Sequence, residues 1–274
     1  VEQLQRLGNV DQPQVSSPAF ERGHRTTVRC QVTDGRAGYR TRRSERSFVA
    51  QECGAADPRL EELVVHGHFG NASEVTLRLG AETNERLVIT NGNVDDVSLP
   101  DDVLVVAADD PGDAAIHEVV AGIRWRVSAG SFFQTSHAGA EALVAAVARG
   151  LGDSDGPVVD LYAGVGLLGG AAAAGRIRYA VESNPSSVAD ARHNLAADVK
   201  VVQARVEQWS PKAFDTIIAD PARRGLSKDG VRIIERVGGN HLVLVSCDPA
   251  SLGRDAGLLA EHGWTHEGAE VIDM

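Results

Sequence analysis

The 274-residue sequence has few cysteines, few aromatic residues and no long apolar run. Its three cysteines, Cys30, Cys53 and Cys247, stand far apart without a paired spacing, which excludes a disulfide scaffold and is typical of a reducing cytoplasm. Uncharged apolar runs such as residues 242–245 are far shorter than the ~20 residues of a membrane-spanning helix. We therefore expect a cytoplasmic chain with no membrane partner.

The sequence also has no secretory signal, and its only methionine is the last residue, Met274. Because the chain begins at Val1 without an initiator methionine, we expect a piece of a longer gene product, with further motifs outside the printed sequence. The apolar content of 43% and the charged content of 24% are those of a folded globular chain with one large or two modest domains.

The charge is unevenly distributed along the chain. A formal net charge of −11 argues by itself against nucleic acid, since phosphate binding needs cationic surface. Residues 22–46, however, contain eight arginines against two acids, whereas residues 91–118 contain eight acids and no lysine or arginine. This segregation predicts one basic face on an acidic molecule, and the alternative is a solvated arginine-rich hairpin.

The pattern of apolar residues changes near residue 128 and predicts two domains. Before it, a short helix end over residues 1–7 precedes alternating segments and Asn/Gly/Asp turns, which predict a small α+β domain with a helix over 59–66. After it, a helix over 137–149 precedes β-branched runs that alternate with helical stretches, as in a doubly wound α/β sheet. We thus predict domains over 1–127 and 128–274, with ligands beyond the carboxyl ends of the parallel strands.

A glycine-rich loop follows the first of these strands, at residues 158–161. Gly164, Gly166 and Gly169 spell GxGxxG, and Glu182 lies 18 residues after the first glycine, as in a dinucleotide-binding site. A plain glycine-rich turn is the alternative. Asp160, four residues before the first glycine, instead suits the cationic sulfonium of S-adenosylmethionine better than a pyrophosphate.

Two further strand ends carry candidate chemistry. Asp220 follows the strand at 216–219 and is the first residue of an Asp-Pro-Ala-Arg motif. We expect it at the same carboxyl edge of the sheet as the glycine-rich loop, and the alternative is that it is a plain turn residue. Cys247 follows the strand at 241–245, just before a helix expected to begin near Ser251. A nearby helix N-terminus favours the nucleophilic thiolate, whereas most such cysteines are buried small hydrophobes.

Five motifs occur in order along the chain. They are Phe132-Phe133-Gln134, the run 160–166, Val181-Glu182, Asp220-Pro221-Ala222-Arg223-Arg224-Gly225 and the run 246–255. Together they resemble the bacterial RNA 5-methyluridine methyltransferases of the TrmA and RlmD type over residues 18–274. The resemblance implies a Rossmann-like class I methyltransferase domain that methylates carbon 5 of a uridine in structured RNA, either tRNA or 23S rRNA, with S-adenosylmethionine as methyl donor.

The resemblance also implies roles for individual residues. Cys247 is the implied nucleophile, which adds to carbon 6 of the uracil ring so that carbon 5 becomes reactive. Phe132 is implied to stack near the flipped base, and core packing is the alternative for both Phe132 and Tyr162. The implied cofactor-binding positions are Gln134, Tyr162, Gly164, Glu182 and Asp220.

The chain departs from the family pattern at several points. Ala222, Asp248 and Ser251 stand where proline, asparagine and threonine are usual, and the carboxylate of Asp248 is expected to raise the pKa of the neighbouring thiol. The helix after Gly166 is expected to be short. The family's proton-abstracting glutamate lies beyond the segment resembling residues 271–274, so we assign no base and expect the printed chain to form a covalent adduct without full turnover.

Relatives in this family often carry an N-terminal RNA-binding β-barrel and a 4Fe–4S cluster. Cys53 resembles the fourth ligand of that cluster, and a plain semi-buried cysteine is the alternative, because one thiolate cannot hold a cluster. Two other functions stay open: a catalytically impaired RNA-binding factor on the same fold, and a nicotinamide-dependent oxidoreductase that rests only on the glycine pattern. A monomer is the simplest expectation for the oligomeric state.

The arginine-rich stretch resembles the region of the family that faces RNA. Guanidinium groups suit both phosphate recognition and base stacking. Neutralising Arg40, Arg42 and Arg43 should therefore weaken RNA binding and flatten its dependence on salt concentration, as measured by titrations at several ionic strengths. An unchanged salt slope would remove that role from the three residues.

Overall fold

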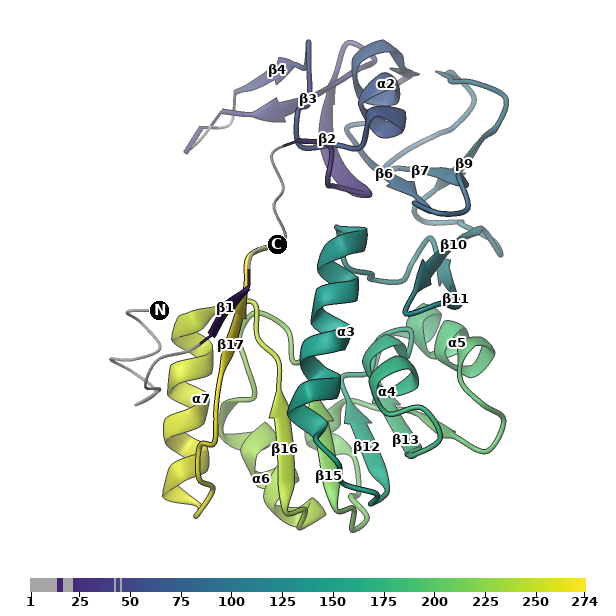
Figure 1. The fold of residues 1–274 in the computed structure, drawn as a ribbon. Helices are drawn as coiled ribbons and strands as arrows, with labels where there is room; N and C mark the ends of the chain where they lie inside the picture. Colours follow the sequence, from purple (N-terminus) through teal and green to yellow (C-terminus); the bar gives the residue numbers. More distant parts are fainter. Residues whose placement is uncertain (1–13, 17–21, 42, 45) are drawn as a thin grey trace. The chain divides into compact units, whose positions relative to one another are not determined.

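The computed structural model describes residues 14–16, 22–41, 43–44 and 46–274, which form two compact units (Figure 1). The N-terminal unit holds the described residues from 22 to 141 together with Met274, and the C-terminal unit holds 14–16 and 142–273. The structural division follows Glu141, whereas the sequence pattern changes near residue 128, so the domain ranges 1–127 and 128–274 stay a prediction. The helix end expected over residues 1–7 lies outside the described residues.

A mixed β-sheet of order β4-β3-β2-β6-β7-β9 forms the framework of the N-terminal unit. Its strands are β2 (Thr27–Thr33), β3 (Arg36–Arg40), β4 (Ser47–Val49), β6 (Glu74–Leu79), β7 (Arg86–Thr90) and β9 (Val103–Ala107). Neighbouring strands are antiparallel except β7 and β9, which pair in parallel. Two further antiparallel pairs lie outside this sheet: β5 (His68–Phe69) with β8 (Val97–Ser98), and β10 (Ala115–Val120) with β11 (Ile123–Ser128).

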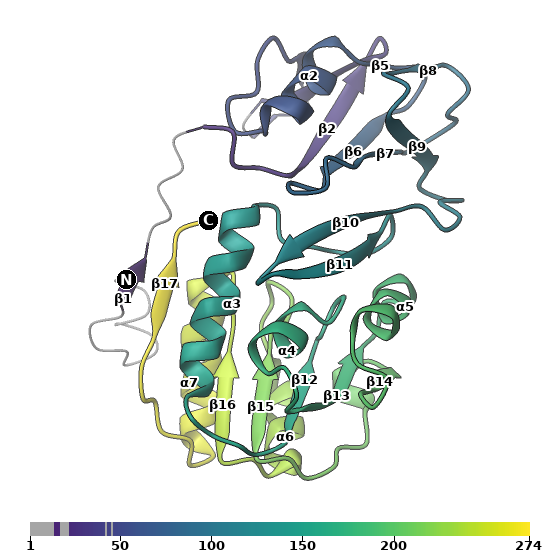
Figure 2. The same cartoon turned by 45° about the vertical axis from the view of Figure 1, so that its right-hand side comes forward.

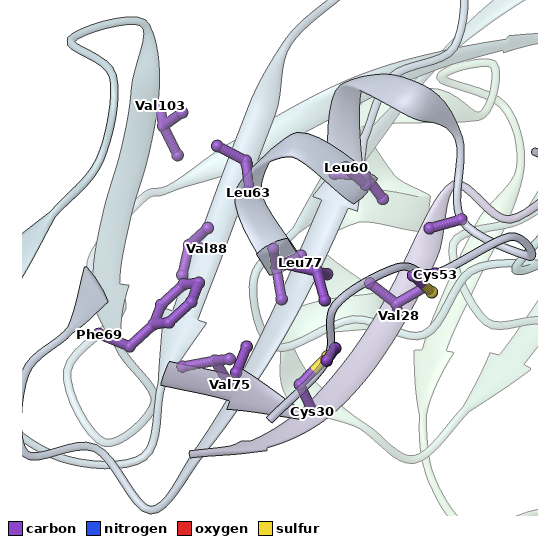
Figure 3. Close-up of a cluster of buried hydrophobic side chains, with 14 of the residues drawn as sticks. Val28, Cys30, Cys53, Leu60, Leu63, Phe69, Val75, Leu77, Val88 and Val103 are labelled. Atoms are coloured by element: carbon purple, nitrogen blue, oxygen red, sulfur yellow. The ribbon is translucent and has the colours of Figure 1, made fainter. Parts of the chain in front are cut away.

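Helix α2 (Pro58–His66) packs on this sheet and closes the core of the N-terminal unit. Asp57 caps the helix by accepting a hydrogen bond from the backbone N–H of Arg59 at 2.9 Å, and Pro58 occupies the first turn, where its missing N–H costs nothing. Leu60 and Leu63 then face Leu77 of the sheet inside one buried apolar cluster, and Figure 3 shows these side chains gathered between helix and strands.

The C-terminal unit contains a parallel sheet of order β14-β13-β12-β15-β16. Its strands are β12 (Val158–Leu161), β13 (Ile177–Glu182), β14 (Lys200–Gln203), β15 (Thr216–Ala219) and β16 (His241–Leu244), and Figure 2 shows them running in one direction. The chain passes from β12 through β13 to β14, then returns to add β15 and β16 on the other side. A reversal of this kind opens a crevice at the carboxyl ends of the central strands. The expected fold class, a Rossmann-like class I methyltransferase sheet preceded by an α+β part, is confirmed.

Helices α6 and α7 bury one face of the parallel sheet. The remaining helical elements are α3 (His137–Leu151), α4 (Leu167–Ala172), α5 (Pro185–Asn194), η1 (Val206–Gln208), α6 (Ser227–Val237) and α7 (Pro249–Glu261). Leu161 and Ile217 share an apolar cluster with Ile234 of α6 and Leu259 of α7. Because side chains alternate along a strand, Asp160 points to the opposite face, where α4 packs.

The C-terminal unit is completed by β17 (Glu270–Ile272), which pairs in parallel with β1 (Gln14–Ser16). Across the described part of the chain, none of the helices combines the length and apolar composition that a bilayer span requires.

Candidate active site

Four adjacent strands deliver polar side chains to one edge of the parallel sheet. Glu182 ends β13, Tyr162 follows β12, Asp220 follows β15, and Cys247 stands three residues after the end of β16. The ladder continues beyond the strands, since the N–H of Asp220 donates to the carbonyl of Leu161 at 3.3 Å. Neighbouring strands lie about 4.8 Å apart, so the register places these four side chains along one short edge.

The buried carboxyl group of Asp160 fixes the start of the glycine-rich loop. Asp160 is 1% exposed, and its Oδ2 accepts a hydrogen bond from the N–H of Gly169 at 2.9 Å. A side chain at position 169 would place its Cβ 2.7 Å from that oxygen, so only glycine allows this approach. Burial raises the pKa of Asp160 to about 7, and the nearby carboxylates of Asp220 and Glu182 add to the shift.

The carboxylate of Glu182 shapes the middle of the loop. Its Oε2 accepts from the N–H of Gly164 at 3.0 Å, and its Oε1 accepts from the N–H groups of Ser183 and Asn184 at 2.6 and 2.7 Å. Gly164 has φ +57°, and a Cβ built on it would meet no atom within 4 Å, so the loop leaves open space there. Glu182 therefore stands half-buried beside that space with its carboxylate oriented by backbone donors.

Tyr162 and Asp220 lie on the neighbouring strand ends. Tyr162 adopts φ +62°, and its hydroxyl donates to Oε1 of Glu207 at 3.0 Å, while burial raises the pKa of the phenol. Its ring packs against the apolar cluster beneath α6. Asp220 is half-buried, and burial raises the pKa of its carboxyl group to about 6.

Cys247 is an exposed free thiol immediately before helix α7. The alternative that Cys247 is a buried hydrophobe is therefore wrong. Asp248 is the N-cap of α7, and its carboxylate accepts from the N–H of Ser251 at 2.7 Å. The hydrogen bonds from Ser251 lower the pKa of Asp248, and Arg223 adds a smaller attraction. Since Asp and Asn cap helices equally well, this contact explains an acid where the family usually has asparagine.

Three side chains of α7 hold the loop that follows Asp220. The hydroxyl of Ser251 donates to the carbonyl of Arg223 at 2.8 Å, and the guanidinium of Arg254 donates to the carbonyl of Arg224 at 2.5 Å. Asp255, 1% exposed, accepts from the N–H of Leu226 at 2.6 Å. The helix that begins beside Cys247 thus fixes the loop that begins at Asp220, a role that the sequence analysis did not assign to these residues.

Phe132 and Gln134 belong to the N-terminal unit. Phe132 is 65% exposed, so core packing is wrong for its side chain, and Gln134 is half-buried. Arg78 of β6 fixes the loop that carries them, because its guanidinium donates to the carbonyls of Ser128 and Ser131 at 2.9 and 2.5 Å. The structure therefore brings Tyr162, Gly164, Glu182, Asp220 and Cys247 to one sheet edge, with Phe132 and Gln134 on the other unit.

The arginine-rich hairpin carries an exposed aromatic residue that the sequence analysis did not select. Phe48, 52% exposed, lies on the edge strand β4, with its ring centroid 6.3 Å from that of Tyr39. Arg40 ends β3 on the same hairpin and is exposed, as is Arg43. Arg42 lies outside the described residues.

Cys53 lies in the core of the N-terminal unit. Its sulfur is 2.8 Å from the hydroxyl oxygen of Tyr39, and its N–H donates to Glu61 at 2.7 Å. Burial raises the pKa of the neighbouring Cys30 to about 11. Within the residues that the structure describes, no group of three or more His, Cys, Asp or Glu side chains is placed to hold a metal ion, so they give no support to the predicted 4Fe–4S cluster.

Asp160 should leave a signature in the pH dependence of stability. Its folded pKa of about 7 lies above the unperturbed value of about 3.9, so it contributes stability at low pH that is lost as pH rises through about 7. Asp160→Asn keeps an acceptor for Gly169 but cannot ionise. We expect urea unfolding to show a smaller loss of stability between about pH 5 and pH 8 than in the wild type.

The remaining loss would come from Asp220, whose pKa is raised in the same direction. Asp229→Asn, on exposed α6 surface, is the matched control and should retain the wild-type pH dependence. The same loss in Asp160→Asn as in the wild type would contradict the assignment.

No protein-family model matches the sequence. Two proteins named as uncharacterized RNA methyltransferases, from Streptomyces avermitilis and Streptomyces coelicolor, are 32% and 31% identical to the chain over 91% of its length. The chain spans 64% and 60% of the length of these two relatives.

Among solved structures, the chain is similar to the tRNA (uracil-54, C5)-methyltransferase of Pyrococcus abyssi in complex with S-adenosyl-L-homocysteine. The TM-score is 0.75 at 24% identity, and the alignment covers 94% of this chain and 74% of that one. At this identity the likeness establishes the shared fold. The names of the two Streptomyces relatives, together with this shared fold, confirm the resemblance to RNA methyltransferases that the motifs predict.

Proposed function

We propose that the chain carries the catalytic centre of an enzyme that transfers a methyl group from S-adenosylmethionine to carbon 5 of a uridine in structured RNA. The observation that carries the proposal is the exposed thiol of Cys247 at the same sheet edge as Glu182, Gly164 and Asp220. A nucleoside cofactor and a covalent nucleophile on one edge suit alkylation of a carbon that must first be activated.

The residues at this edge fit the cofactor. Glu182 can accept hydrogen bonds from the ribose diol beside the open space at Gly164. The carboxyl groups of Asp160 and Asp220 favour a cationic ligand, and Oδ1 of Asp160 is buried without a hydrogen-bond partner among the described residues. Gln134 and Tyr162 are further cofactor positions by resemblance. When bound, S-adenosylmethionine supplies an electrophilic methyl group.

Cys247 performs the covalent part of the chemistry. Its thiolate adds to carbon 6 of the uracil ring, which forms an S–C6 bond and moves the electron pair of the double bond toward carbon 5 and the carbonyl oxygen at position 4. Carbon 5 then takes the methyl group from the donor, whose sulfur–methyl bond breaks with the electron pair left on the sulfur, so that the donor would leave as a neutral thioether. A base removes the proton from carbon 5, the S–C6 bond breaks, and the double bond and the thiolate are restored. Phe132 is proposed to stack beside the extruded base.

The RNA substrate is proposed to be tRNA rather than 23S rRNA, because the named substrate of the Pyrococcus protein is tRNA. Arg40, Arg42 and Arg43 are proposed to contact its backbone, and the exposed ring of Phe48 offers a stacking surface on the same hairpin. The oxidoreductase alternative leaves the exposed Cys247 without a role.

Replacing the proposed nucleophile should abolish covalent capture of the substrate. In RNA that contains 5-fluorouridine, fluorine cannot leave as a proton, so the enzyme–RNA adduct persists and runs as a shifted band on a denaturing gel. We expect this band with the wild type and none with Cys247→Ala. Cys53→Ala removes a buried thiol and is the matched control, which should keep the band. A band of normal intensity in Cys247→Ala would rule out the mechanism.

The ribose contact predicts a separate binding defect. Glu182→Gln replaces the carboxylate that accepts from the diol, and the loss of charge-assisted hydrogen bonds should weaken S-adenosylmethionine binding about tenfold to a hundredfold. Calorimetric titration measures this directly. Glu235→Gln, on the exposed surface of α6, should bind normally. Wild-type affinity in Glu182→Gln would exclude the contact, and binding of NAD without S-adenosylmethionine would favour the oxidoreductase.

A further inference from the structure

An arginine-lined groove lies on the C-terminal unit, and its lining shares Glu207, Asp248, Ser251 and Arg254 with the contacts described above. Its volume is about 1040 Å³, and all its lining residues belong to this unit. The arginines that line it are Arg205, Arg223, Arg224, Arg232, Arg236 and Arg254. Three acids accompany them, Glu207, Asp229 and Asp248. The groove therefore has a formal balance of +3 on a chain whose formal net charge is −11, a local concentration of positive charge against the overall trend.

Not all of these arginines are neutralised by the fold. Arg232 pairs with Asp229 at 2.9 Å, Arg205 with Glu207 at 3.6 Å, and Arg254 is occupied by Asp255 and by the loop carbonyl described above. Arg224 and Arg236 are exposed, and among the described residues neither has a carboxylate within ion-pair distance. Two guanidinium groups thus face solvent in a groove that already carries positive charge. Their mutual repulsion destabilises the fold, and no ion pair among the described residues offsets it.

The groove adjoins both halves of the proposed catalytic centre. Asp248, which lines it, directly follows Cys247 in the chain. Glu207, which lines it as well, accepts the hydrogen bond from Tyr162, the residue that follows β12 at the cofactor edge. The part of the groove at Asp248 and Glu207 therefore adjoins residues of the proposed catalytic centre, which favours the substrate itself over an unrelated anion.

We propose that this groove binds the phosphate backbone of the RNA strand next to the target uridine, with Arg224 and Arg236 as the principal phosphate contacts. The inference rests on the proposed function. A uridine must leave its stack before carbon 6 reaches a thiol, so the flanking backbone has to be held in place. Planar guanidinium groups bind phosphate oxygens bidentately, and an open groove of this size takes more than one phosphate. The partner is RNA, held by charge rather than by base sequence.

The test is the salt dependence of RNA binding by the full chain. A fluorescein-labelled tRNA transcript serves as the probe, because phosphate contacts are independent of sequence. Each contact to a single strand contributes about 0.7 to the slope of log affinity against log salt, so Arg224→Gln/Arg236→Gln should flatten the slope by about 1.4. We expect affinity to fall about tenfold at low salt, with S-adenosylmethionine affinity unchanged. Arg224→Lys/Arg236→Lys keeps both charges and should restore the slope.

The matched control removes two arginines from the same unit away from the groove. Arg178→Gln/Arg192→Gln, on β13 and α5, should retain the wild-type slope. A wild-type slope in Arg224→Gln/Arg236→Gln would overturn the groove proposal and leave the methyl-transfer proposal intact. A wild-type chain that binds S-adenosylmethionine but not the transcript would overturn the groove, whereas absence of the Cys247 adduct would count against the proposed function itself.

Discussion

The parallel register of β12 between β13 and β15 is the constraint on which the candidate site depends. Leu161 lies opposite Val181 on one side and Ala219 on the other, so the three strands end at one level. Ala219 in turn lies opposite Leu244 of β16, which carries the chain toward Cys247. A slip of one residue in any of these pairs would turn the affected side chains to the other face of the sheet. The chemistry is therefore fixed by backbone hydrogen bonds before any ligand binds.

Much of the C-terminal sheet could be predicted from the sequence, because buried parallel strands are short β-branched runs that end in glycine or acid. Gly164, Glu182, Asp220 and Cys247 were found as residues that follow such runs, and the structure assembles them as expected. β10, in contrast, was not predicted. Its Ala-Ile-His-Glu-Val-Val pattern buries Glu118, an acid at a core position, and so lacks a clean apolar alternation.

Other features depend on contacts that no local pattern encodes. The hydrogen bond from the N–H of Leu226 to the carboxylate of Asp255 joins residues 29 positions apart, and it forms only when α7 is folded. The arginine groove draws on η1, α6, α7 and the loop after β15, so its charge is dispersed in the sequence, unlike the compact cluster at residues 22–46. The exposure of Phe48 likewise could not be predicted from its local pattern, because it depends on β4 lying at the edge of the sheet.

The contacts between α7 and the loop after Asp220 couple local unfolding of this helix to loss of the candidate site. Ser251, Arg254 and Asp255 all sit in the first two turns of that helix, and Asp248 caps it one residue after the thiol. If those turns fray, the cap, the loop and the position of the sulfur are lost in a single event. Local unfolding of these turns would thus abolish the activity of the site as a whole. It would leave no form in which Cys247 is in place without the loop, and so none that could react with the wrong target.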